Sequence, residues 1–328
     1  MAYTDIDKPS DYFNTVLWTG NGSGATISGV GFQPDWVWEK SRSDTYNHNL
    51  IDSVRGANKV LEANNNESEA TKDNTLMSFN SDGFVYGANA GWSNNGSTFV
   101  AWNWKKQAGV FDIQTYTGNG SNRTISHNLG TVPKMMIIKK RNTSAPWSVG
   151  HASLGANQVL ELDATDAVAT DNSYWNNTRP TSSVFSLGTD GNQNTDGHTY
   201  VIYLFGNKQG MSNMGSYIGN GNADGSFVFL GFKPAFIIIK KSSNAGNDWY
   251  MWDNKRNTSN LTNKYLNPDL NAAEGTANYG YIDFLSNGFK TRATGNTDEI
   301  NQNGHKFIYM AFAENPFVTS TGVPATAR

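Results

Sequence analysis

The sequence contains no cysteine, few charged residues and no long apolar segment, and each absence excludes a class of protein. Without cysteine among its 328 residues, the chain has no disulfide and can mature in a reducing compartment. No run of 18 apolar residues occurs, and residues 1–11 lack the positive start and apolar stretch of a secretory signal. We therefore expect no membrane partner and no export by the general route, while the place where the protein works stays open.

Charge is scarce as well. Lys, Arg, Asp and Glu make up 16% of the chain, the net charge is −3, and 42 residues are asparagine. A surface of amides and hydroxyls produces little long-range field, so the sequence predicts no nucleic-acid partner. The five histidines show no metal-ligand spacing and no D-x-D-x-D-G series occurs, so we predict no metal and no cofactor. Oxygen-rich Asp-Gly and Asn-Gly loops leave calcium binding open.

A threefold internal repeat of about 100 residues dominates what is present. An aromatic residue shortly before a Gly-Asn-Gly turn opens each repeat, then comes a proline with an apolar run ending in lysine, and a glycine with an aromatic segment closes it. The openings are residues 18–23, 116–121 and 217–222, the apolar runs are 34–40, 133–140 and 234–241, and the closing segments are 96–104, 197–205 and 304–312. Three landmarks in the same order indicate three related units.

The apolar segments are short, rich in Val, Ile and aromatic residues, and separated by Gly, Asn, Ser and Asp, which is typical of strands joined by turns. We predict an all-β protein of three tandem β-sandwich domains, jelly-roll or lectin-like, with short linkers. The predicted divisions are an N-terminal arm at 1–11, repeats at 12–107, 108–209 and 210–317, and a C-terminal arm at 318–328. We expect the two arms to be extended and either disordered or ordered by a neighbouring subunit. Residues 62–75, 163–180 and 257–276 are expected to be long surface loops with a helical turn each.

Catalytic residues that had been copied with the repeats would recur at matching positions, and they do not. Asp52 and Arg55 of the first repeat correspond to His151 in the second and to Asp253 and Arg256 in the third. We interpret these residues as a structural ion pair, and the loop acids, Glu69, Glu274, Asp298 and Glu299 among them, as solvated charges. The sequence therefore predicts no enzyme and no catalytic residue.

The ten tryptophans raise the alternative of carbohydrate binding, since sugar sites stack aromatic rings on pyranose faces. Trp36, Trp38, Trp102 and Trp104 lie in the repeated strands, where we expect core. The tryptophans outside the repeated pattern are the candidates for exposed glycan contact: Trp92, Trp147, Trp175, Trp249 and Trp252.

Several motifs in order along the chain resemble a known class of protein. They are residues 5–13 (Asp-Ile-Asp-Lys-Pro-Ser-Asp-Tyr-Phe), 18–22, 33–38, 52–56 and 81–84. With these, the chain resembles tandem-repeat virion proteins of tailed bacteriophages, particularly marine ones, over almost its whole length. The resemblance implies β-sandwich units and a particle surface, and it brings no catalytic residue.

Two functions follow from this resemblance and are kept apart. The first is a non-enzymatic virion surface protein made in the bacterial host cytoplasm, a capsid decoration or head-appendage protein that contacts other virion proteins through a terminal arm. The alternative is a tail fibre or adhesin module that binds host surface polysaccharide. Three similar units match a local threefold position of a shell as a monomer, and trimerisation of the chain is the other arrangement.

Overall fold

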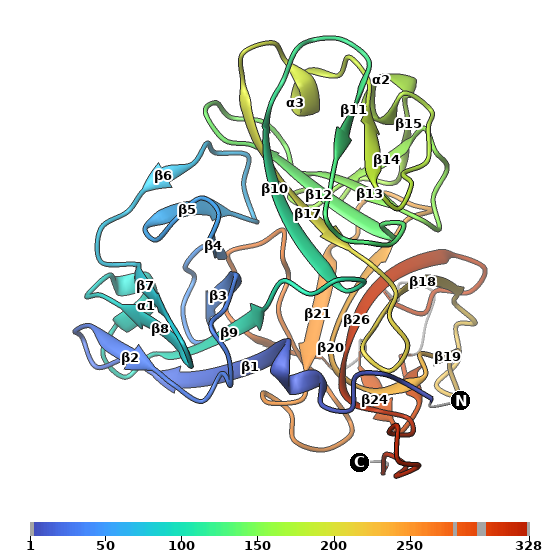
Figure 1. Ribbon diagram of the computed structural model, residues 1–328. Helices are drawn as coiled ribbons and strands as arrows, with labels where there is room; N and C mark the ends of the chain where they lie inside the picture. Colours follow the sequence, from blue (N-terminus) through green and yellow to red (C-terminus); the bar gives the residue numbers. More distant parts are fainter. Residues whose placement is uncertain (1–2, 278–280, 294–299, 327–328) are drawn as a thin grey trace.

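The computed structural model describes residues 3–277, 281–293 and 300–326. Strands account for 43% of the residues and helices for 5%, and the strand pairs are antiparallel, so the predicted all-β fold is confirmed. The elements follow one another in three groups, called units 1, 2 and 3 here, which appear blue to cyan, green to yellow and orange to red (Figure 1).

Unit 1 begins with a short 3-10 helix and contains nine strands and one helical turn. In chain order these are η1 (Pro9–Asp11), β1 (Phe13–Thr19), β2 (Ala25–Ile27), β3 (Trp36–Ser41), β4 (Asn49–Asp52), β5 (Lys59–Glu62), β6 (Ala70–Thr71), β7 (Leu76–Asn80), β8 (Gly83–Tyr86), α1 (Ala90–Ser93) and β9 (Thr98–Trp104). A sheet in the order β1-β9-β3-β4-β5-β6 is accompanied by a smaller sheet, β2-β8-β7.

Unit 2 repeats this plan. Its elements are β10 (Phe111–Thr117), β11 (Arg123–Ser126), β12 (Met135–Lys140), β13 (Ser148–His151), β14 (Gln158–Glu161), β15 (Ala169–Thr170), α2 (Asn172–Trp175), β16 (Val184–Leu187), α3 (Gly191–Asn194) and β17 (Thr199–Phe205). The larger sheet has the order β10-β17-β12-β13-β14-β15, and β11 pairs with β16.

Unit 3 has longer central strands. Its elements are β18 (Ser212–Ile218), β19 (Phe227–Phe229), β20 (Phe232–Lys241), β21 (Trp249–Asp253), β22 (Lys264–Tyr265), β23 (Gly275–Thr276), β24 (Ile282–Leu285), β25 (Gly288–Thr291) and β26 (Lys306–Pro316). The sheets are β18-β26-β20-β21, β19-β25-β24 and β22-β23. Of the three helical turns expected in the long loops, only α2 lies where predicted; the other two loops contain β6, β22 and β23 instead.

The continuous apolar runs form central strands that are covered on both faces. In β20, Ile238 lies in an apolar cluster at the centre of the molecule, whereas Ile237 and Ile239 belong to a cluster inside unit 3. Successive residues of a strand point to opposite faces, so a strand with a core on each side needs apolar residues throughout. Units 1 and 2 each have such an inner cluster of their own.

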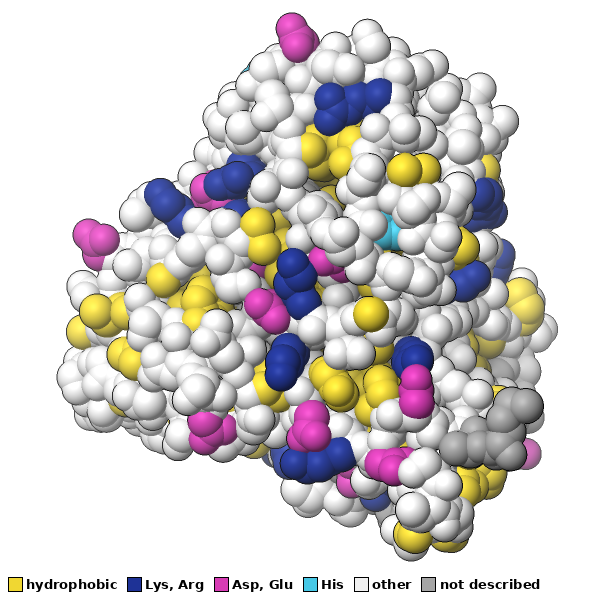
Figure 2. Space-filling view, in the orientation of Figure 1, with side chains coloured by type: hydrophobic (Ala, Val, Ile, Leu, Met, Phe, Trp, Pro, Cys, Tyr) yellow, Lys and Arg dark blue, Asp and Glu magenta, His cyan; other side chains and the backbone are white. Residues whose placement is uncertain are grey.

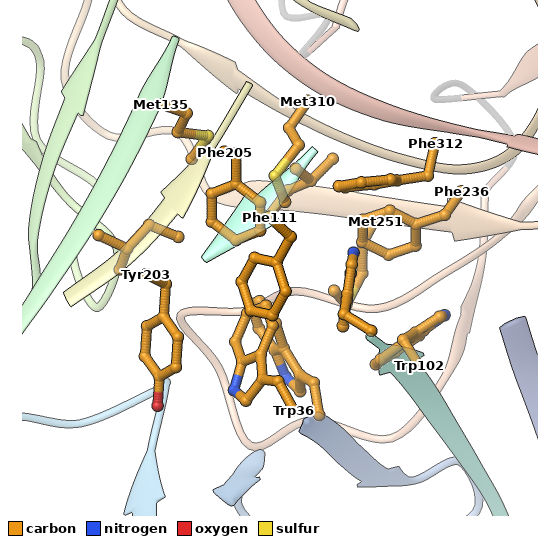
Figure 3. Close-up of a cluster of buried hydrophobic side chains, with 14 of the residues drawn as sticks. Trp36, Trp102, Phe111, Met135, Tyr203, Phe205, Phe236, Met251, Met310 and Phe312 are labelled. Atoms are coloured by element: carbon orange, nitrogen blue, oxygen red, sulfur yellow. The ribbon is translucent and has the colours of Figure 1, made fainter. Parts of the chain in front are cut away.

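The central cluster joins all three units. Figure 3 shows rings from each unit converging there, Trp36 and Trp102 from unit 1, Tyr203 and Phe205 from unit 2, and Phe312 with others from unit 3. The ring centroids of Trp36 and Tyr203 are 4.5 Å apart, those of Phe205 and Phe312 6.2 Å. The three units are therefore held by a shared core as well as by linkers, and their division into separate domains stays a prediction.

Backbone hydrogen bonds close the three units into a ring. The amide of Glu69 in unit 1 donates to Arg141 O at 2.8 Å, that of Val168 in unit 2 to Ser242 O at 3.0 Å, and that of Glu274 in unit 3 back to Arg42 O at 2.7 Å. The same contact is thus made at each of the three junctions. The molecule is a pseudo-threefold ring made from one chain.

Both predicted arms fold back on unit 3 of the same chain. Tyr3 Oη donates to Gly231 O at 3.0 Å, and Thr4 Oγ1 donates to Gln209 O at 2.8 Å. The two ends also meet, because the Ser320 amide donates to Asp7 Oδ1 at 2.6 Å. Residues 1–2 and 327–328 lie outside the described residues. The arms are ordered by their own chain, and the expectation of disorder or of ordering by a neighbouring subunit is wrong for residues 3–11 and 319–325.

The surface has few charges. On the face in Figure 2, uncharged polar groups predominate, and basic and acidic side chains lie scattered between small apolar spots. Among the described residues, no helix is long and apolar enough to cross a bilayer.

Candidate functional site

The five tryptophans expected to be exposed for glycan contact are buried, and that expectation is wrong. Trp92, Trp147 and Trp252 have no exposed surface, Trp249 is 1% exposed and Trp175 3%. Trp147 and Trp249 are at the junctions between units, where their indole Nε1 atoms donate to Glu62 O at 2.8 Å and to Glu161 O at 2.9 Å. Trp92 and Trp252 belong to the inner clusters of units 1 and 3.

Both Asp–Arg ion pairs that the sequence suggested are formed in the structure. Arg55 Nε lies 2.5 Å from Asp52 Oδ2, and Arg256 Nε lies 2.5 Å from Asp253 Oδ2, with all four side chains buried. Burial alone would raise the pKa of Asp253, but the Arg256 charge and hydrogen bonds from Arg256 and Lys255 outweigh burial and lower that pKa. Each carboxylate also accepts a hydrogen bond from a neighbouring unit, Asp52 from Tyr203 Oη at 2.8 Å and Asp253 from Trp102 Nε1 at 3.1 Å.

Two of the loop acids form ion pairs with arginines and are not solvated charges. Glu69 accepts two hydrogen bonds from the Arg141 guanidinium, at 2.9 and 3.0 Å, and Glu274 accepts two from Arg42, both at 2.9 Å. Arg141 belongs to unit 2 and Arg42 to unit 1, so each ion pair joins two neighbouring units of the ring. The interpretation of these two acids as solvated charges is wrong; Asp298 and Glu299 lie outside the described residues.

Unit 2 lacks the Asp–Arg pair. By strand register, Asp52, His151 and Asp253 occupy one position, opposite Trp36, Met135 and Phe236. Burial lowers the pKa of His151 to about 4, so the imidazole is neutral at pH 7, and its Nε2 lies 3.2 Å from Tyr309 O of unit 3. At its junction with unit 3, unit 2 therefore uses a neutral imidazole at the position where units 1 and 3 have a buried aspartate.

A pocket of about 290 Å³ opens on the other face of the same strand in unit 2. By register Ile51, Gly150 and Trp252 are equivalent, opposite Val37, Met136 and Ile237. Units 1 and 3 place a large buried side chain at this position, whereas in unit 2 the Trp175 indole packs against Gly150. The residues lining the pocket come from three loops and from β12–β14 and α2: Val132, Pro133, Lys134, Met136, Gly150, His151, Ala152, Gly155, Ala156, Gln158, Trp175, Thr178, Arg179 and Pro180.

The wall of the pocket is apolar and closely packed. A Cβ atom added to Gly150 would lie 2.9 Å from Trp175 Cζ2 and 3.2 Å from Met136 Cε, so only glycine fits under the indole. The indole is fixed by a hydrogen bond from Nε1 to Gln158 O at 3.0 Å. Among the five candidate tryptophans, Trp175 therefore borders this pocket, as part of its wall rather than on an exposed face.

Two cations without acidic partners border this pocket. The exposed Arg179 donates to the backbone oxygens of His151 and Leu154, and neither it nor Lys134 forms an ion pair with a carboxylate in the part of the chain that the structure describes. By contrast, Arg42, Arg55 and Arg141 all have carboxylate partners. The pocket thus combines an apolar wall with free positive charge.

The remaining chemistry of the site is limited. Within the described residues no group of three His, Asp or Glu side chains is arranged to hold a metal ion. A glycine in a buried strand, at the position where the other two repeats have Ile and Trp, was a signal for the pocket wall that a repeat alignment contains, although sequence reasoning missed it. Lys134 and Arg179 carried no such signal, because they reach the pocket from loops.

Comparisons with known proteins identify a family but no activity. Residues 8–316 match a domain of unknown function, DUF7483, and this one match covers all three units. The search of curated proteins finds no match.

Proposed function

We propose that this chain, which belongs to the DUF7483 family, is a non-enzymatic structural protein of the surface of a tailed-bacteriophage particle, most simply a capsid decoration or head-appendage protein. The observation that carries the proposal is the ring of three similar units with one shared core. Such a body presents three similar faces about one axis. It fits a local threefold position of a shell as a single chain, without requiring three copies.

The end of unit 3 supplies a surface for contact with other virion proteins. Both arms pack there, and near them lie the apolar rings of Phe227 and Phe229, which are 49% and 57% exposed. At positions equivalent to Phe227, units 1 and 2 carry Thr26 and Thr124. Since exposed aromatic pairs mark interaction surfaces more often than chance, we assign the particle contact to this end.

Binding of host surface polysaccharide is the second candidate, and the pocket of unit 2 favours it. Sugar sites are concave and combine an apolar wall with a few polar groups. The pocket has both, although the five tryptophans do not form an exposed platform.

Immunoelectron microscopy of purified particles tests the first candidate. Antibodies against residues 62–75 and 163–180 should label the head surface, and the protein in solution should have the mass of one chain. Labelling confined to the tail tip would refute decoration and favour the second candidate. If intact particles that contain the protein carry no label on the head or the tail, both locations are refuted.

A further inference from the structure

We infer that the pocket of unit 2 binds one carboxylated sugar residue, such as a hexuronic acid, with the ring against Trp175 and Met136 and the carboxylate between Lys134 and Arg179. This inference rests on the second candidate function and names the ligand class for it. Neither the repeat pattern nor the family match assigns a site there.

The size of the pocket limits the ligand. A volume of about 290 Å³ is at the lower end of the range for small-molecule sites, about 300 Å³ and above. One monosaccharide residue or a comparably small ring fits such a space, whereas an extended chain must continue outside it. Thr178 and Ala152 at the border are exposed, so a polymer can leave the pocket there.

The wall favours a ligand with one apolar face. Trp175 and Met136 contribute a buried indole and thioether that only a glycine at position 150 accommodates. A pyranose ring has such a face, formed by its C–H groups.

The two positive charges at the pocket favour an anionic ligand. Arg179 uses two of its five N–H groups on backbone oxygens, so three remain for a ligand. The guanidinium is thereby held in place, and a planar fork of this kind matches a carboxylate. Lys134 supplies a second positive charge with no carboxylate partner in the described chain. Two cations against one small pocket suit a single carboxylate better than a polyphosphate.

Comparison among the units isolates the site. At the position of Lys134, unit 1 has Asp35 and unit 3 has Ala235, and at the position of Gly150 they have Ile51 and Trp252. Lys134 and the glycine that accommodates the Trp175 indole therefore occur together in unit 2 and in neither of the others. The fold needs neither feature, since two copies of it do without them.

Titration of the intact protein with galacturonate, followed by NMR of the tryptophan indole N–H groups, tests the inference. The Trp175 signal, assigned with Trp175→Phe, should move in a saturable way while the Trp92 and Trp252 signals stay. Galactose and acetate, which lack the carboxylate and the ring respectively, should bind at least about tenfold more weakly. Equal binding of acetate, or no movement of the Trp175 signal, overturns the inference.

Variants locate the ligand. Lys134→Ala, which copies unit 3, should weaken galacturonate binding by about 3- to 10-fold without altering Tm, while Lys105→Ala, an exposed lysine elsewhere, should have no effect. Ala156→Phe should fill the pocket and abolish binding. An unchanged affinity in Lys134→Ala refutes the assignment. These results concern the isolated protein, so they leave the particle location, read by microscopy, as a separate outcome.

Discussion

Replacement of Arg256 by Leu should lower stability more than any surface substitution. The guanidinium is buried and pairs with Asp253, so its loss leaves a buried carboxylate without a counter-charge. Removing one partner of such a pair costs about 3–5 kcal/mol. Glu274 keeps its two hydrogen bonds from Arg42, so the loss falls mainly on Asp253.

The expected shift in Tm follows from the size of the chain. An unfolding entropy of about 2.1 cal/mol/K per residue gives about 0.7 kcal/mol/K for 328 residues. A loss of about 3–5 kcal/mol therefore lowers Tm by about 4–7 °C, measured by calorimetry at pH 7. Lys8→Ala breaks the exposed pair with Asp11 and is the control, with an expected shift of about 1 °C or less.

A second variant separates charge from packing. Asp253→Asn with Arg256→Leu removes both charges and keeps an oxygen for Trp102 Nε1, so the double variant should be more stable than the single one. The native pKa of Asp253 is lowered, so its stabilising contribution is present above the unfolded pKa and disappears as pH falls through the native value. In Arg256→Leu, burial without the Arg256 charge raises the pKa of Asp253 above its unfolded value, so protonation of the buried carboxylate as pH falls from 7 to 4 should make the penalty smaller. A double variant as unstable as the single one, or a penalty independent of pH, would refute this reasoning.

Three further results are expected. Gln193→Leu should stabilise the protein by about 1 kcal/mol, because the buried amide has no hydrogen-bond partner among the described residues; a fall in Tm would contradict this. Phe227→Thr with Phe229→Ser should leave Tm unchanged and reduce binding of the purified protein to particles in cosedimentation experiments, since both rings are exposed on an edge strand; equal binding of the two proteins would argue against an apolar contact. Burial lowers the pKa of Lys139 to about 8, below the usual value near 10.4 in an unfolded chain, so its contribution to stability rises between about pH 8 and 10. Lys139→Met should make the measured rise smaller, and an unchanged pH profile would show that Lys139 is not the titrating group.

The sequence was sufficient for the strands and insufficient for how the units associate. Runs such as residues 236–239 have no polar alternation, which indicates a strand with a core on each face, and the structure has such a strand. The same pattern does not indicate whether a face of the strand joins the core of its own unit or a core shared by several units. Ile238 contacts a cluster shared by three units, and only the packing of segments 100 to 300 residues apart decides that.

The tryptophans show why the site was harder to predict. Trp147 and Trp249 lie outside the strongest repeat landmarks, and from that we expected exposure. They are buried because each indole N–H finds a backbone oxygen in the neighbouring unit, a partner that local sequence cannot reveal. The wall of the pocket, in contrast, depends on Gly150, because the Trp175 indole packs against it and its two counterparts are large. Differences between aligned repeats predict a site of this kind better than residue type does.

The shared core has a consequence for synthesis of the protein. Trp102 and Trp104 emerge with unit 1, but Phe236 and Phe312, two of the rings that contact them, belong to unit 3. At about 5–20 residues per second, the roughly 200 residues between these units take about 10–40 s to translate. During that time the nascent chain carries a tryptophan-lined face that unit 3 does not yet cover, so a host chaperone has its best opportunity to bind before the last unit leaves the ribosome.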